Sequence, residues 1–184
     1  MHIKTLLIAI VPMIAVLAGT SAIAEQQSAI KALPRLDSGQ ISPPDVQLKP
    51  ESNTAMLAPA PPLTEMWVYA VGSSDCGWEG TAGKYITSCD HGGSQMRAAV
   101  LEIGYGYSEF AWMNGSLLPS SAQYSNTTVC VTGGYYTWPC TAGQTVVGFL
   151  REFNLDGNQS GTFKYRNTST NSPWNTMNVQ INIR

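Results

Sequence analysis

The chain has 184 residues, a formal net charge of −2, and only 12 % charged residues. Ten Lys or Arg stand against twelve Asp or Glu, and the sequence contains no basic cluster of the kind that binds phosphates, which excludes nucleic acid as the predicted partner. The sequence has no run of like charges, so it predicts no charged patch that would bind a membrane surface.

The first 24 residues have the three parts of a secretory signal peptide. Lys4 supplies the positive region, residues 6–17 form a nearly unbroken apolar stretch, and Ala22-Ile23-Ala24 offers small residues for cleavage. The apolar stretch is shorter than the roughly 20 residues that a stable membrane span takes. We therefore predict cleavage after Ala24, no membrane span in the mature chain, and a secreted or periplasmic location.

Residues 25–63 have the composition of a Pro-rich linker. The segment contains no aromatic residue and ends in Ala58-Pro59-Ala60-Pro61-Pro62. A segment with so few bulky apolar side chains cannot offset the entropy lost on ordering, so we predict disorder with polyproline-like pieces. A cleaved pro-segment is the alternative.

Residues 64–184 predict a single β domain. All five tryptophans and all eight tyrosines lie between Trp67 and Trp174. Short β-branched and aromatic runs, separated by Gly-, Ser-, Thr- and Asn-rich turns, indicate strands, and the spacing of turns is typical of a β-sandwich or small barrel with about seven or eight strands. The candidate strands lie at residues 66–71, 84–88, 96–103, 109–113, 116–118, 127–132, 145–154, 161–166 and 177–183.

Four local patterns are the most informative. Asn114-Gly115 is a strong hairpin signal, and Asp156-Gly157-Asn158 predicts a second hairpin between the strands on either side of it. The stretch 96–103 also allows a helical turn, although a strand is favoured. Residues 177–183 alternate strictly, with their apolar side chains on one face.

The four cysteines, Cys76, Cys89, Cys130 and Cys140, all lie in the predicted β domain. In an exported protein an even number of cysteines indicates disulfides, and four allow three pairings. We favour Cys76–Cys89 and Cys130–Cys140, because each closes a short Gly-rich loop. The paired C-x-x-C spacings of a structural zinc site are absent, and we predict no metal and no cofactor.

His91 is the single histidine of the mature chain and thus the natural candidate for a general base. The sequence lacks the G-x-S-x-G motif of many serine hydrolases, so a loop histidine that holds a turn is favoured over catalysis. Among the carboxylates that could serve hydrolysis, Glu102 interrupts an apolar run, and on a half-buried strand we expect it to face solvent. A secreted hydrolase that uses His91 is the alternative function.

Aromatic residues in turn-rich segments give the main functional signal. Exposed aromatic side chains stack on sugar rings or anchor protein interfaces. We therefore predict a non-enzymatic, monomeric binding protein that contacts a glycan or a protein surface through aromatic loops. A small secreted toxin or inhibitor is a further alternative. The predicted contact residues are Tyr135, Tyr136 and Trp138, within the loop closed by Cys130 and Cys140, together with Trp112 and Trp174.

Several stretches, taken in order along the chain, resemble the YolA-like family of small secreted bacterial proteins, which is grouped around a domain of unknown function. The resemblance covers residues 60–184 and implies export without a settled activity or catalytic residue. It rests on Ala60-Pro61-Pro62-Leu63-Thr64, Val68-Tyr69-Ala70-Val71-Gly72-Ser73, His91-Gly92-Gly93-Ser94, Ile103-Gly104-Tyr105-Gly106-Tyr107 and Ser172-Pro173-Trp174-Asn175-Thr176.

Overall fold

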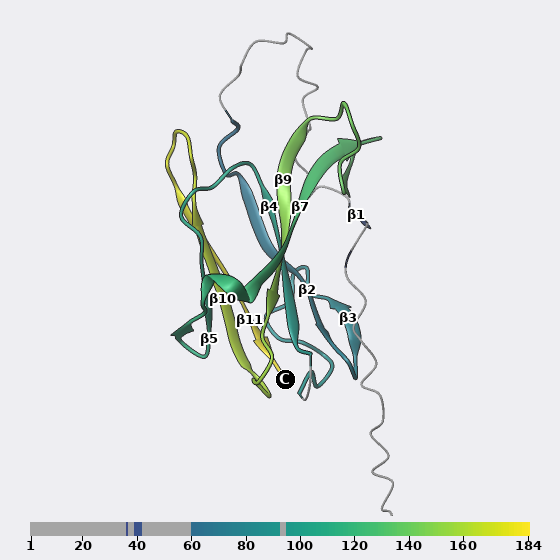
Figure 1. Ribbon diagram of the computed structural model, residues 1–184, viewed down its shortest axis with the longest axis vertical. Helices are drawn as coiled ribbons and strands as arrows, with labels where there is room; N and C mark the ends of the chain where they lie inside the picture. The colour runs from purple at the N-terminus through teal and green to yellow at the C-terminus, as the bar shows by residue number, and fades with distance from the viewer. Residues whose placement is uncertain (1–35, 37–38, 42–59, 93–94) are drawn as a thin grey trace, which may run out of the picture.

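The computed structural model describes residues 36, 39–41, 60–92 and 95–184, and these form two packed β-sheets (Figure 1). The predicted all-β sandwich is confirmed, and the described residues form more strands than expected. Their only helix is a short 3-10 turn, Ser120–Ala122. The described part of the chain has no helix with the length and apolar character that a bilayer crossing requires.

The large sheet has the strand order β1-β8-β7-β9-β4-β2-β3, and its neighbouring strands are antiparallel. Its strands are β1 (Gly39–Ile41), β2 (Glu65–Ser73), β3 (Gly77–Gly80), β4 (Arg97–Ile103), β7 (Gln123–Thr132), β8 (Tyr135–Trp138) and β9 (Val146–Asn154).

The small sheet has the order β11-β10-β5-β6. It consists of β5 (Phe110–Met113), β6 (Ser116–Leu117), β10 (Gly161–Thr168) and β11 (Thr176–Ile183). The predicted alternation of β11 is confirmed, since its apolar residues face the core while Asn178, Gln180 and Asn182 are exposed.

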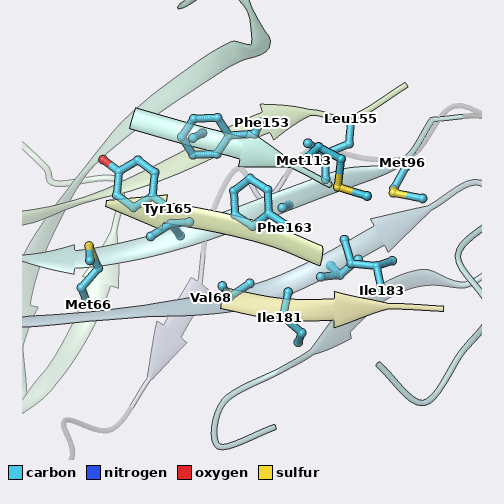
Figure 2. Close-up of a cluster of buried hydrophobic side chains, with 14 residues drawn as sticks. Met66, Val68, Met96, Met113, Phe153, Leu155, Phe163, Tyr165, Ile181 and Ile183 are labelled. Carbon is cyan, nitrogen blue, oxygen red and sulfur yellow. The ribbon is translucent and has the colours of Figure 1, made fainter. Parts of the chain in front are cut away.

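Strand β4 carries two cores because its successive side chains point to opposite faces of the large sheet. Ala98 and Val100 face the small sheet and join the core between the sheets, whereas Ala99 and Leu101 belong to a second cluster on the other face. In the first core, the ring of Phe153 lies 5.5 Å from that of Phe163 and 5.4 Å from that of Tyr165 (Figure 2). Both faces of β4 are therefore buried, which explains its long apolar run.

The hairpin at Asn114-Gly115 is confirmed. Strands β5 and β6 pair across it, and both turn residues have positive φ, 52° and 79°. Asparagine and glycine tolerate this conformation better than other residues, which is why the dipeptide marks such turns.

The second predicted hairpin is wrong. Strands β9 and β10 flank Asp156-Gly157-Asn158, but they belong to different sheets. Leu155 is buried in the core between the sheets, and its backbone N–H donates to the carbonyl of Met96. This anchor carries the chain from the large sheet to the small one, so the turn residues mark a change of sheet.

The predicted signal peptide, residues 1–24, and most of the predicted linker lie outside the described residues. Within the linker the structure differs from the expected disorder at β1, which pairs with β8. The predicted strand at residues 84–88 is also absent, and only a single bridge between Ile86 and Asn182 forms there. Whether each of these two segments becomes a strand depends on backbone pairing with a neighbouring strand. The amino-acid composition of a segment does not reveal such pairing.

Candidate functional site

Two of the five predicted contact residues are buried. Tyr136 and Trp138 are 1 % and 2 % exposed and belong to the core cluster on the outer side of β4. The expectation of an exposed aromatic tip was wrong for these two, because residues 135–138 form the strand β8 and not a loop. Alternation along that strand turns Tyr136 and Trp138 inward and leaves Tyr135 42 % exposed.

The remaining three contact candidates do not gather at one place. Tyr135 is on the large sheet, whereas Trp174 is 60 % exposed in the connection between β10 and β11. Trp112 lies in the middle of β5, on the small sheet. The predicted aromatic loops therefore form no single surface.

The structure contains the favoured disulfides, Cys76–Cys89 and Cys130–Cys140, with Cα atoms 6.3 Å and 5.5 Å apart. The second bond closes the β7–β8 hairpin, and Cys130 itself is buried. This bond ties a core position to the loop after β8.

Trp112 instead belongs to a group of side chains on the outer face of the small sheet. Residues of β5 and β10 pair so that Trp112 stands beside Lys164, and Phe110 beside Arg166. The Phe110 and Trp112 rings are stacked with centroids 5.9 Å apart. The Arg166 guanidinium carbon lies 4.9 Å from the centroid of Phe110 and 5.4 Å from that of Trp112. The Lys164 ammonium lies 5.9 Å from the Trp112 ring. We call these four residues, Phe110, Trp112, Lys164 and Arg166, the cationic aromatic face.

The cationic aromatic face has no acidic counterpart on its own strands. Strands β5, β6, β10 and β11 contain no Asp or Glu, and Lys164 and Arg166 are their only charged residues. Asn178 pairs with Arg166, and Gln180 pairs with Lys164, so exposed amides extend both rows across β11. The sheet thus presents two positive charges, two rings and a row of amides on a chain whose net charge is negative.

Sequence reasoning missed Phe110, Lys164 and Arg166. A signal was present in β10, where Lys164 and Arg166 alternate with the aromatic residues Phe163 and Tyr165. This period of two predicts that both cations share the outward face.

A group of hydrogen-bonded polar side chains around Glu102 is buried at the end of the core between the sheets. Glu102, expected in solvent, is fully buried, because it lies on the same face of β4 as Ala98 and Val100. Arg151 Nε donates to Glu102 Oε2 at 2.5 Å, and Asn167 Nδ2 donates to the other oxygen at 2.8 Å. Arg151 Nη2 also contacts Glu109 Oε1 at 2.7 Å.

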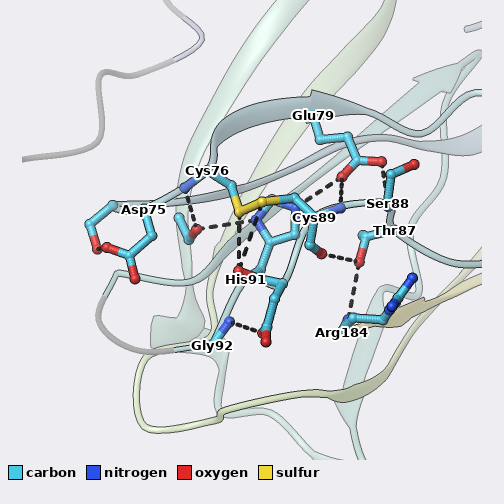
Figure 3. The surroundings of a disulfide bond; sticks show 12 residues. Asp75, Cys76, Glu79, Thr87, Ser88, Cys89, His91, Gly92 and Arg184 are labelled. Carbon is cyan, nitrogen blue, oxygen red and sulfur yellow. Dashed lines mark hydrogen bonds and ion pairs between the residues drawn. A yellow bond between two sulfur atoms is a disulfide. The ribbon is translucent and has the colours of Figure 1, made fainter.

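His91 lies outside the strands, as the loop interpretation expects, and it is fully buried between a hydroxyl and a carboxylate (Figure 3). Its Nδ1 is 3.2 Å from Ser73 Oγ, and its Nε2 is 3.3 Å from Glu79 Oε2. Because a carboxylate only accepts, Nε2 carries the proton at this contact. The three residue types are those of a hydrolytic triad, in which a histidine links a serine to an acid.

The burial of this group favours a structural role. Ser73 and His91 are both inaccessible, and Ser73 Oγ accepts the backbone N–H of Cys76 at 3.1 Å. The His91 backbone N–H donates to the carbonyl of Arg184 at 2.5 Å. The network thus joins β2, β3, the disulfide loop and the end of β11, and it offers no support for the hydrolase alternative. Among the described residues, no group of three or more His, Cys, Asp or Glu is arranged to hold a metal ion.

Glu79 is the charged centre of the network. Burial opposes its ionisation, but hydrogen bonds from Lys84, from the backbone of Cys89 and Ser88 and from His91 outweigh burial and hold the pKa of Glu79 well below 4.5. A carboxylate with a depressed pKa stabilises the fold above its unfolded pKa, and this stabilisation disappears as the pH falls through the folded pKa.

Replacing Glu79 by glutamine is therefore expected to lower the free energy of unfolding at pH 7 by on the order of 1–2 kcal/mol. The difference from the wild type should narrow as the pH falls below about 4.5. Urea unfolding at a series of pH values measures both effects. Asp75→Asn, which removes the same charge from an exposed position, is the control and should change little. If the stability difference between the wild type and Glu79→Gln stays constant with pH, ionised Glu79 is not the source of the stabilisation.

Comparison with known proteins gives a family without an activity. No curated protein and no solved structure matches the chain. A family model described as "Domain of unknown function (DUF4879)" matches residues 58–183. This range contains every strand from β2 to β11 and the cationic aromatic face. The chain therefore belongs to the DUF4879 family of domains of unknown function.

Proposed function

We propose that this protein is an exported binding protein that holds a carboxylate-bearing polysaccharide on its cationic aromatic face. The observation that carries the proposal is the pairing of two stacked rings with two cations on strands that contain no Asp or Glu. The hydrolase and toxin alternatives make no use of this face.

Each part of the face matches one part of such a ligand. Aromatic rings present flat apolar area on which sugar rings stack at low entropic cost. The guanidinium of Arg166 can form two parallel hydrogen bonds to a carboxylate. Asn178 and Gln180 carry both donors and acceptors, which suits sugar hydroxyls. A neutral or basic polymer would offer no anionic partner to the two cations.

The contact side chains also extend across several strands, which suits a polymeric ligand. The rows Trp112–Lys164–Gln180 and Phe110–Arg166–Asn178 run side by side across three adjacent strands. Two parallel rows of contact side chains suit successive sugar units of a long chain. This differs from the aromatic loops expected from sequence, because the contact residues lie on strands that the sandwich holds rigidly.

Export forms part of the proposal. The two disulfides, Cys76–Cys89 and Cys130–Cys140, are compatible with an oxidising compartment outside the cytoplasm. The signal-peptide pattern of residues 1–24 supports the same location. We also propose that the chain is related to the YolA-like family of secreted proteins, a resemblance that likewise implies secretion.

Affinity electrophoresis in gels that contain polygalacturonate tests the binding. The wild-type domain should be retarded, and both Trp112→Ala and Arg166→Gln should lose roughly tenfold or more in affinity, as expected when a central aromatic or arginine contact is truncated. Retardation should weaken with added salt, because exposed charge pairs are screened. A gel with dextran, a neutral polymer, should retard none of the proteins.

Tyr135→Ala is the matched control, because it removes an exposed ring from the other sheet. It should bind like the wild type, and all variants should melt within a few degrees of it. Equal retardation of the wild type and the Trp112→Ala and Arg166→Gln variants would contradict the proposal. Loss of binding in Tyr135→Ala alone would move the contact to the β7–β8 hairpin.

A further inference from the structure

A cavity of about 320 Å³ opens beside the cationic aromatic face, between the two sheets. It lies where the chain leaves β6, passes through Pro119 and Ser120, and enters the large sheet at Gln123. Its walls are mostly apolar and include Leu118, Phe110 and Phe153. Its volume lies at the lower end of the range that small-molecule sites occupy.

The charges beside this cavity do not balance. Arg151 is the one cation in contact with both Glu102 and Glu109, and Asn167, the other partner of Glu102, is neutral. Glu102 and Arg151 are buried, whereas the Glu109 side chain is 30 % exposed and lines the cavity. The group therefore carries one surplus negative charge, and Glu109 presents it to the cavity.

Tyr165 is also one of the lining residues, but its side chain is fully buried and its hydroxyl has no exposed surface. The hydroxyl lies beside the Glu102 carboxylate and belongs to this buried polar group, not to the surface of the cavity. Figure 2 shows the Tyr165 ring next to that of Phe153. Glu109 is therefore the polar side chain that the cavity offers to a ligand.

The titration of Glu109 fits a site that exchanges a proton for another cation. Burial raises the pKa of Glu109; Arg151 lowers it and Glu102 raises it. Burial and the neighbouring Glu102 also raise the pKa of Tyr165, so its hydroxyl stays protonated. A proton and a bound cation thus compete for the Glu109 carboxylate.

We propose that this cavity binds a small apolar primary amine, with the ammonium group at the Glu109 carboxylate and the apolar body against Leu118 and Phe153. The ammonium pairs with Glu109 and cancels the surplus negative charge there. Aromatic walls also favour a cation over a neutral group of the same shape. An anionic ligand meets the surplus negative charge and is rejected. The cavity shares Phe110 with the cationic aromatic face, but this inference does not rest on the polysaccharide proposal.

Three ligands with one shared body test the proposal: tryptamine, its alcohol analogue tryptophol, and indole-3-propionate. Calorimetry or protein-observed NMR should show that tryptamine binds roughly tenfold or more tightly than tryptophol, the scale expected for a partly buried charge pair. Indole-3-propionate should not bind. The affinity for tryptamine should rise as the pH increases through the raised pKa of Glu109, because the carboxyl loses its proton while the amine stays charged.

Variants locate the binding in the cavity. Glu109→Gln should remove the preference for the amine, and Leu118→Trp, which fills the cavity, should weaken all binding. If Leu118→Trp does not fold, Leu117→Trp, at an exposed position of the same cavity, serves in its place and should also weaken binding. Asp75→Asn should bind tryptamine like the wild type, and Glu109→Gln should still bind polygalacturonate. Equal binding of tryptamine and tryptophol, or no tryptamine binding at millimolar concentration, would overturn the proposal.

Discussion

Replacing Arg151 by methionine is expected to lower the free energy of unfolding by about 3–5 kcal/mol, the range for removal of one partner from a buried ion pair. The change leaves Glu102 fully buried without its cation, although Asn167 still donates to it. Glu109 loses its cationic partner as well. Urea unfolding of the two proteins at pH 7 measures the loss.

Two further proteins show whether the isolated charge is the cause. Lys84→Met removes an ion pair to Glu79 whose lysine side chain is 41 % exposed, and such pairs contribute about 0–1 kcal/mol. The double variant Arg151→Met, Glu102→Gln removes the isolated charge but keeps an acceptor for Asn167. It should recover on the order of 1–3 kcal/mol. A double variant no more stable than Arg151→Met would show that packing, and not charge, explains the loss.

Strands with one buried face were predictable from their period. Residues 177–183 alternate because β11 has the core on one side and solvent on the other. Strand β4 shows the opposite case, since both of its faces are buried and its sequence has no clear period. That is why the same residues also allowed a helical interpretation, and only pairing with β2 and β9 decides the matter.

Turn residues predicted where the chain reverses but not which sheet it joins next. Asn114-Gly115 and Asp156-Gly157-Asn158 look alike in sequence, yet the first joins neighbouring strands and the second joins two sheets. The difference comes from Leu155, which anchors in the core just before the turn. Such an anchor depends on long-range packing, which local propensity does not encode.

The candidate site could be predicted only in part from the sequence, because its residues also meet through long-range contacts. Trp112 was predicted as a contact residue, but its partners Lys164 and Arg166 lie far along the chain and reach it through the register of β5 with β10. Glu102 was placed in solvent because Arg151 and Asn167, which allow its burial, are equally distant in sequence. Charge compensation in a core is a property of pairs, so no single stretch reveals it.

Replacing Trp138 by alanine is the second change with a large expected effect, a loss of about 3–5 kcal/mol, as for other buried tryptophans. Its ring packs edge-to-face on Tyr69, with centroids 5.2 Å apart. Its Nε1 donates to the backbone carbonyl of Leu36 at 3.2 Å. The loss should appear as a lower urea midpoint, and Tyr135→Ala, on the exposed side of the same strand, should stay within about 0.5 kcal/mol of the wild type.

Gly39→Ala separates the packing of Trp138 from its contact with β1. A Cβ atom at Gly39 would lie 2.2 Å from Cζ2 of Trp138, so even a methyl group displaces β1 or the ring. Strand β1 has three residues and pairs only with β8, whereas Trp138 also packs in the core cluster that includes Leu101 and Leu150. We therefore expect Gly39→Ala to cost much less than Trp138→Ala. Equal losses would mean that Trp138 stabilises the domain chiefly by holding the segment before it, and the folded unit would then begin at β1.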